Sequence, residues 1–518
     1  MTPSPERQVN PWIVAISVML ATFMEVLDTT VVNVSLPHIA GSLSVSEDEA
    51  TWTLTSYLVS NAIILPLTGW LAQTFGRKRL LMAAVAGFTA GSVLCGMSAS
   101  ITMLIVFRVI QGAAGGVLQP VSQAVMLEGF PPEDRGKAMG FWGVGIVVAP
   151  MLGPVLGGWI TDNYTWRWIF YINVPVGIAS ILMTRLFVSD PPYLRRTSMG
   201  VDKWGIGLLA LGMAALQVVL DKGQEKDWFG SQMIIDLSVI CFAALTLFVI
   251  QELTTEHPVV NLRVFRDRTY AAGTGLMTLL GFVLYGSLVA LPLFLQTLLG
   301  YTSQHTGITM LPRGLGSFLA MPLVGILVGR FDARKMLAVG AVGAGLSIVM
   351  LSHLNLDAGY WSLFLPQFLQ GIFTAMLFVP LTTVTMDPIR PEEMGNATSL
   401  FNLMRNIGGS VGISTGTTII ARASQTFVND LVPNVNVYRF TQRSLLAMLR
   451  AYFVSRGSDA VTATHQAYAA ISGMVGQQAA LLAYINEFKF FGIVSIAMAP
   501  LVLLMRRPRG RRGPVAMH

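Results

Sequence analysis

The chain has 518 residues, of which 53% are hydrophobic and only 12% are charged. A soluble globular protein carries about 25% charged residues, so this composition excludes an ordinary soluble domain. The apolar residues form long runs without strand-like alternation, which predicts an all-α integral membrane protein rather than a β-barrel.

Fourteen apolar runs are long enough to cross a bilayer, which takes about 20 residues. We expect the first run to be kept as a span, because it is too long for the core of a signal peptide. The links are short except for residues 422–487. Cys95 and Cys241 lie inside runs, so we expect no disulfide and no metal site. The predicted spans are residues 12–37, 52–74, 80–98, 102–127, 138–160, 168–188, 203–221, 233–252, 270–298, 307–329, 336–355, 361–385, 396–421 and 488–505.

Positive charges indicate how the chain is oriented in the membrane. With fourteen spans both termini lie on one side, and placing them in the cytoplasm puts most of the 34 Lys and Arg residues in cytoplasmic segments. Arg77, Lys78 and Arg79 and the arginines within 506–512 contribute most clearly. This asymmetry predicts cytoplasmic termini, and the net charge of +7 therefore reflects topology and not a nucleic-acid partner.

A repeat in the sequence predicts two related halves. The segment 132–138 after the fourth span resembles 391–397 after the twelfth. The pair Gln111-Gly112 recurs as Gln370-Gly371, at the same distance along the chain. Spans one to six thus correspond to spans nine to fourteen, and spans seven and eight are an insertion. Two parallel six-span halves with the substrate path between them are a known plan of secondary transporters.

The repeat also predicts the domain organisation. We expect an N-terminal six-helix bundle at 1–195, an inserted helix pair at 196–260 and a C-terminal six-helix bundle at 261–518. The C-terminal bundle would include a long periplasmic loop at 422–487, in which apolar residues around 445–453 have helical spacing. Docking of a partner and capping of the transporter are both compatible with this loop.

No phosphate-binding loop, zinc-protease motif or serine-hydrolase motif occurs in the sequence. We therefore expect neither enzymatic activity nor a cofactor. A protein of this kind that pumps must use an ion gradient, and we expect the proton gradient to be its source of energy.

Ionisable side chains within the spans are the main functional candidates, because a charge in hydrocarbon is costly. Glu25 and Asp28 lie three residues apart on one face of the first span. Two neighbouring carboxylates repel each other, so we expect at least one of them to bind and release protons near neutral pH. Arg108 in the fourth span needs a buried partner, and a fixed structural pair with a carboxylate is the alternative to a role in proton coupling.

Other residues of the spans are candidates for the substrate cavity or for helix contacts. Arg405 and Arg313 are candidates in the second half. The cavity candidates are Asp28, Glu25, Asn33, Gln111, Arg405 and Gln370. In the fifth span, small residues allow close helix contact and prolines allow bending, at Gly145, Pro150, Gly153, Pro154, Gly157 and Gly158.

Several segments resemble signatures of the major facilitator superfamily. Residues 69–79 resemble its motif between spans two and three, 108–116 its proton-coupling motif in span four, and 145–158 its antiporter motif in span five. Residues 27–37 and 166–175 resemble signatures of the fourteen-span drug:proton antiporters of the EmrB/QacA type, and the chain is most similar to the EmrB-like branch. The resemblance implies a gating loop that includes Gly69, Gln73, Gly76, Arg77 and Lys78.

The resemblance further implies a bacterial cytoplasmic (inner) membrane and two six-helix bundles that rock around a central cavity. It implies proton-driven efflux of small hydrophobic drug-like substrates, with a periplasmic membrane-fusion adaptor and an outer-membrane channel as partners. Gln73 departs from the usual Asp of the gating motif, and Glu25 stands where many relatives are uncharged. A proton-coupled uptake permease of the same fold and a non-transporting membrane receptor or scaffold are the alternatives.

Overall fold

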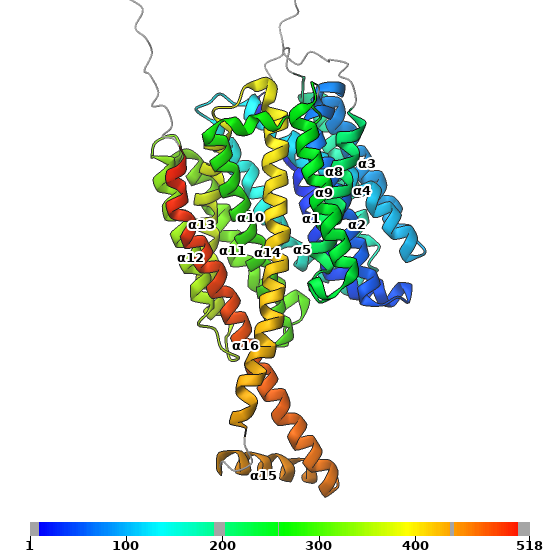
Figure 1. The fold of residues 1–518 in the computed structure, drawn as a ribbon, viewed down its shortest axis with the longest axis vertical. Helices are drawn as coiled ribbons and strands as arrows, with labels where there is room; N and C mark the ends of the chain where they lie inside the picture. The colour runs from blue at the N-terminus through cyan, green and yellow to red at the C-terminus, as the bar shows by residue number, and fades with distance from the viewer. Residues whose placement is uncertain (1–9, 191–201, 257, 436–439, 506–518) are drawn as a thin grey trace, which may run out of the picture.

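The computed structural model describes residues 10–190, 202–256, 258–435 and 440–505, and within these ranges it contains helices but no β-strand. Thirteen described helical segments are long and apolar enough to cross a membrane, which confirms the predicted all-helical membrane fold. The arginines predicted to mark the cytoplasmic side at 506–512 lie outside the described residues, as does the predicted boundary between 195 and 196. Figure 1 shows an elongated bundle from one end of which three helices protrude, α14 (Met394–Leu431), α15 (Phe440–Ser455) and α16 (Ala460–Leu501).

The first half of the chain forms seven helices with recognisable end signals. Ser46 caps the second helix, because its hydroxyl accepts a hydrogen bond from the Glu49 amide at 3.2 Å while the Glu49 carboxylate accepts one from the Ser46 amide at 3.1 Å. Gly76 separates the second and third helices at φ +85°, a conformation that glycine adopts without strain. A break divides the predicted sixth span into one turn and a longer helix. The helices are α1 (Pro11–Leu43), α2 (Glu47–Phe75), α3 (Arg77–Gly96), α4 (Ile101–Gly129), α5 (Arg135–Asn163), α6 (Trp168–Tyr171) and α7 (Asn173–Phe187).

The inserted helices form a hairpin that lies outside the two halves and touches both. Its first helix packs against α2 and α14. The Lys222 ammonium donates a hydrogen bond to the Thr51 hydroxyl at 2.8 Å, and the Trp228 indole donates one to the Thr418 hydroxyl at 3.2 Å. The hairpin thus connects α2 of the first half to α14 of the second half. Its helices are α8 (Lys203–Lys222) and α9 (Gln232–Thr254).

The second half contains the remaining helices. The predicted span 396–421 corresponds to α14, which carries Asn396, Asn402 and Arg405 and is more polar than the thirteen apolar segments. The residue boundaries predicted for the two bundles and the inserted pair stay predictions. Besides α14 to α16, the helices of this half are α10 (Arg268–Thr297), α11 (Ser303–Leu327), α12 (Ala333–Leu351) and α13 (Tyr360–Met386).

Residues 422–487 form helices in most of their described length, where the sequence predicted a long loop. Helix α14 continues to Leu431, and α16 begins at Ala460 rather than near 488. The early part of α16 is rich in alanine and glutamine, which favour helix but give little hydropathy. The apolar residues around 445–453 lie on α15, at the tip of the protrusion and far from the end of α16 at Leu501 (Figure 1).

The two halves meet mainly along two pairs of helices, α5 with α11 and α2 with α14, and α5 also contacts α13 while α4 contacts α14. Gly136 and Gly325 make the first contact possible, since a Cβ on either residue would lie 2.6 Å from the carbonyl oxygen of the other. Trp142 of α5 stacks on Phe378 of α13 with ring centroids 6.1 Å apart, so the apolar core continues across the boundary. The helix ends that meet at Gly136 and Gly325 lie at the end of the bundle opposite α15.

Candidate functional site

Asp28 and Arg108 form a buried ion pair inside the first half. The Arg108 Nη1 atom lies 2.6 Å from Asp28 Oδ2, and both side chains are 0% exposed. Arg108 also donates from Nε to the Thr53 carbonyl oxygen at 3.1 Å, and its guanidinium lies 4.2 Å from the centre of the Tyr57 ring. Helices α1 and α4 are therefore held together at this point by opposite charges that water does not reach.

Neutral amides complete the surroundings of Asp28. Its Oδ1 atom accepts hydrogen bonds from Gln111 Nε2 at 3.0 Å and from Asn173 Nδ2 at 2.7 Å. The Gln111 oxygen in turn accepts a hydrogen bond from Arg108 Nη1 at 2.8 Å. One ion pair and two amide donors thus surround the Asp28 side chain.

Glu25 lies one turn away on α1 in different surroundings. Its Oε2 atom accepts a hydrogen bond from Gln119 Nε2 at 2.5 Å, and its Oε1 atom accepts from Asn61 Nδ2 at 3.3 Å and from the Tyr57 hydroxyl at 3.4 Å. Glu25 is 5% exposed, and it forms no ion pair within the part of the chain that the structure describes. The two carboxylates of α1 thus differ, since only Asp28 has a direct counter-ion.

Gln119 connects Glu25 to the second half. Its side-chain oxygen accepts a hydrogen bond from Nη2 of Arg405 on α14. The Arg405 side chain is buried, and its Nε and Nη1 atoms have no hydrogen-bond partner among the described residues. The same two helices meet again at Gln123, whose oxygen accepts from Asn402 Nδ2 at 2.5 Å. These contacts, together with the Thr398 hydroxyl on the Pro120 carbonyl oxygen at 3.1 Å, form what we call the α4–α14 seam.

The second half repeats this arrangement with neutral groups. Gln370 of α13 donates from Nε2 to the Ser287 hydroxyl of α10 at 3.4 Å, as Gln111 donates to Asp28 in the first half. Arg313 of α11 is also buried, and its Nε and Nη2 atoms have no partner within the described structure. Gln370 therefore lies inside the second half and is separate from the group around Glu25.

The predicted antiporter motif brings α5 against α1. A Cβ on Gly157 would lie 3.0 Å from the Val31 carbonyl oxygen, and Gly153 faces Thr30 in the same way. Gly145 lies against Met19 further along α1. Asn33, the other cavity candidate on α1, is exposed. Pro150 and Pro154 lie within α5, and Gly158 is buried there.

The predicted gating loop lies where the two halves meet. Gly69 of α2 approaches Asn396 of α14 closely, because a Cβ on Gly69 would lie 2.7 Å from the Asn396 Cα. Arg77 forms an ion pair with Glu128 and also donates to the Pro391 carbonyl oxygen at 3.5 Å.

Lys78 of the same loop forms its hydrogen bonds with the end of the first half. Lys78 donates from Nζ to the Arg185 carbonyl oxygen at 2.7 Å, and its backbone N–H donates to Asp190 at 2.8 Å. Gln73, which replaces the usual Asp, forms no hydrogen bond with the described residues.

Several important residues escaped the sequence analysis. Gln119 and Gln123 recur after Arg108 and Gln111 at intervals that keep them on one face of α4, and this spacing was an available signal. Glu487 of α16 is 0% exposed, and neither carboxylate oxygen has a hydrogen-bond partner among the described residues. It was not predicted as a buried membrane carboxylate because residues 422–487 were predicted to form a loop outside the spans.

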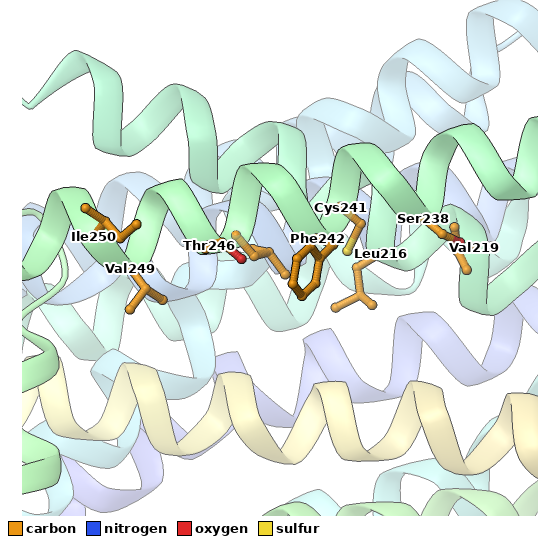
Figure 2. A pocket seen from close by; sticks show the side chains of 9 residues that line it. Leu216, Val219, Ser238, Cys241, Phe242, Thr246, Val249 and Ile250 are labelled. Atoms are coloured by element: carbon orange, nitrogen blue, oxygen red, sulfur yellow. The ribbon is translucent and has the colours of Figure 1, made fainter.

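An apolar groove of about 560 Å³ lies on the inserted hairpin and is separate from the buried carboxylates. Figure 2 shows Leu216, Cys241 and Phe242 among the side chains of α8 and α9 that line it. Phe242 is 76% exposed, so in a bilayer the acyl chains of lipids are the natural covering of this groove.

Two helical halves joined along paired helices, with a buried ion pair inside the first half, are typical of a polytopic membrane transporter. The model of the Major Facilitator Superfamily matches residues 18–413, and the chain belongs to this superfamily. Because the superfamily consists of transporters, the chain is a transporter and not an enzyme.

Three known proteins illustrate the relationship. Over 506 residues the chain is 35% identical to the multidrug export protein EmrB of Escherichia coli K12, which covers 97% of this chain and 96% of that protein. Over 498 residues it is 36% identical to the fatty acid resistance protein FarB of Neisseria gonorrhoeae, with 96% of each chain covered. The crystal structure of the human organic anion transporter MFSD10 has a TM-score of 0.59 at 14% identity and covers 95% of this chain and 100% of that chain, which shows a shared fold.

Proposed function

We propose that the protein is a proton/drug antiporter that exports small hydrophobic compounds across a bacterial cytoplasmic membrane. The contrast between the two carboxylates of α1 carries this proposal. Asp28 is neutralised by Arg108 at 2.6 Å, whereas Glu25 accepts hydrogen bonds only from uncharged groups in the described structure. A buried carboxyl without a direct counter-ion can exist in the protonated form at little electrostatic cost, which suits Glu25 to carry the transported proton.

In the proposed cycle, a proton from outside displaces the drug from the region of Glu25 and Asp28. Arg108 then stabilises the carboxylate of Asp28 as the site is reset. The proton gradient is the only source of energy, and no cofactor takes part. Close packing of α5 on α1 at Gly153 and Gly157 supports the rocking of the first half as a unit.

The names of the relatives support the class of substrate. EmrB is a multidrug export protein and FarB confers resistance to fatty acids, and both are similar to this chain over nearly its whole length. Hydrophobic compounds that are toxic to a bacterium are therefore the expected substrates.

The position of the end of α16 relative to the protruding helices suggests how the protein is oriented in the membrane and which partners it binds. With the end of α16 in the cytoplasm, as the positive charges predict, the protruding helices point into the periplasm (Figure 1). Met448, Tyr452 and Val454 of α15 are between 46% and 68% exposed, which gives this helix an apolar surface. In a host with an outer membrane, we propose that a membrane-fusion adaptor and an outer-membrane channel complete a tripartite pump.

The experiment that tests the proposal measures proton release from inverted membrane vesicles that hold an acidic interior, followed with a pH-sensitive dye. Adding a drug should dissipate the gradient with wild-type protein but not with Glu25→Gln or Asp28→Asn. Lys137→Gln, which breaks the exposed pair of Lys137 with Asp134, is the matched control and should behave as wild type. Drug-induced proton flux of wild-type size in both carboxylate variants would contradict the proposal.

A further inference from the structure

We infer that Gln119 is a proton-sensing relay that couples the protonation of Glu25 to the contact between the two halves. The inference rests on the proposed function, because it takes Glu25 as the proton carrier. Gln119 is 7% exposed and touches both sides at once, with its nitrogen on Glu25 of α1 and its oxygen on Arg405 of α14.

The direction of the hydrogen bonds gives the mechanism. Gln119 donates from Nε2 to Glu25 Oε2 at 2.5 Å, which requires this oxygen to be an acceptor. When a proton binds to Oε2, the new O–H group needs an acceptor, but the group that faces it is the Gln119 NH₂, which is a donor. Rotation of the Gln119 amide by half a turn brings its oxygen to this position, where it accepts from the Glu25 hydroxyl.

The rotated amide no longer fits Arg405. Its NH₂ group now faces the guanidinium, and a guanidinium has donors only. Arg405 already has two nitrogens without partners among the described residues, and Gln119 supplies its shortest hydrogen bond. A buried cation that loses this bond destabilises the closed α4–α14 seam, and water that enters between the halves can solvate the freed groups.

Opening of the α4–α14 seam on protonation of Glu25 is the direction of change that antiport requires. A deprotonated Glu25 keeps the seam closed at the end of the bundle opposite α15, which the proposed orientation places in the cytoplasm. A proton that arrives from the periplasm opens the seam, so the site turns toward the cytoplasm only after it has accepted its proton.

One alternative position of the proton must be tested, since Glu25 has a second oxygen. Oε1 faces the hydroxyl of Tyr57, which can turn to accept a hydrogen bond and would leave Gln119 undisturbed. Asn61 donates to the same oxygen and opposes a proton there. The polar groups that face Glu25 from the surrounding helices are Asp28 of α1, Tyr57 and Asn61 of α2, Gln119 of α4 and Arg405 of α14, with Arg108 on the Tyr57 ring.

The test measures how pH changes the distance between the halves. Spin labels on Arg79→Cys and Lys335→Cys report on it, because both positions are exposed at the starts of α3 and α12. The buried Cys95 and Cys241 are replaced by serine. In otherwise wild-type protein, acidification should raise the ratio of open to closed seam by about 10-fold, the effect of one hydrogen bond to a charged group.

Gln119→Met keeps the length of the side chain but removes both hydrogen bonds, and it should make this ratio independent of pH. Gln119→Leu serves the same purpose if the first variant is poorly produced. Gln123→Leu is the matched control, because it removes the seam contact with Asn402 but touches no carboxylate. It should open the seam at every pH and still show the full response to acid.

Two results would overturn the relay. The first is a pH response of wild-type size in both Gln119 variants, which would assign the response to another group such as Asp28. The second is loss of the response in Tyr57→Phe with the response kept in Gln119→Met, which would place the proton on Oε1.

The same preparations separate this inference from the proposed function. Absence of drug-induced proton flux in wild-type vesicles would refute antiport, whereas the label distances would still report whether Gln119 transmits the proton. Normal flux in wild type together with an unchanged pH response in the Gln119 variants would refute only the relay.

Discussion

Replacing Asp28 with asparagine should destabilise the fold as well as stop coupled transport. The new side chain has nearly the same shape, but it leaves Arg108 as a buried cation without its counter-ion. Both side chains are 0% exposed, and the charged atoms lie 2.6 Å apart. Breaking a buried ion pair costs about 3–5 kcal/mol. Because the asparagine oxygen can still accept a hydrogen bond, we expect a loss of about 3 kcal/mol, at the lower end of this range.

The assay is denaturant unfolding of the purified protein in detergent, with the free energy of unfolding as the readout. Combining Asp28→Asn with Arg108→Gln removes both charges and should recover about 1–2 kcal/mol of the loss. Lys137→Gln breaks an exposed pair 2.7 Å long and should cost less than about 1 kcal/mol. If Asp28→Asn costs no more than this surface variant, the assignment of a dry, charge-balanced pair is wrong.

Three further predictions concern other parts of the molecule. Gly136→Leu should lower transport at least about 10-fold with normal membrane insertion, because its side chain would collide with the Gly325 carbonyl oxygen; transport equal to wild type in vesicles would contradict this. Removing α15 should leave drug-induced proton release in vesicles unchanged but abolish resistance in cells, if the protruding helices dock an adaptor; retained resistance would argue against docking. Glu487→Leu should leave the free energy of unfolding unchanged or raise it by about 1 kcal/mol, because the carboxyl is buried without a described partner; a loss of several kcal/mol would show that the group has one.

The fold was largely predictable from the sequence because hydropathy decides where a chain can cross a bilayer. The prediction was wrong where a helix extends beyond its apolar part. Helix α16 begins at Ala460 in a segment too polar to be predicted as a span, and α14 continues past the predicted end of its span to Leu431. Helix formation there depends on propensity and on packing against the rest of the protein, which a hydropathy window does not measure.

The buried pair was predictable in outline, since a membrane arginine needs a counter-charge. The sequence did not predict that Arg108 pairs with Asp28 and not with Glu25. The two carboxylates lie on the same face of one helix, and only the packing of α4 distinguishes them. Gln119 escaped for a related reason. A neutral amide carries no electrostatic signal in a sequence, and its importance follows only from the groups at its two ends.

The inserted hairpin makes the two boundaries between the halves unequal in their exposure to lipid. Helix α8 covers the side where α2 meets α14, and Lys222 and Trp228 fasten it to both halves. No described helix from outside the halves covers the side where α5 meets α11 in this way. A hydrophobic compound dissolved in the membrane would therefore find the α2–α14 boundary covered by α8 and the α5–α11 boundary uncovered. Lateral entry from the bilayer, where it occurs, has a single available flank.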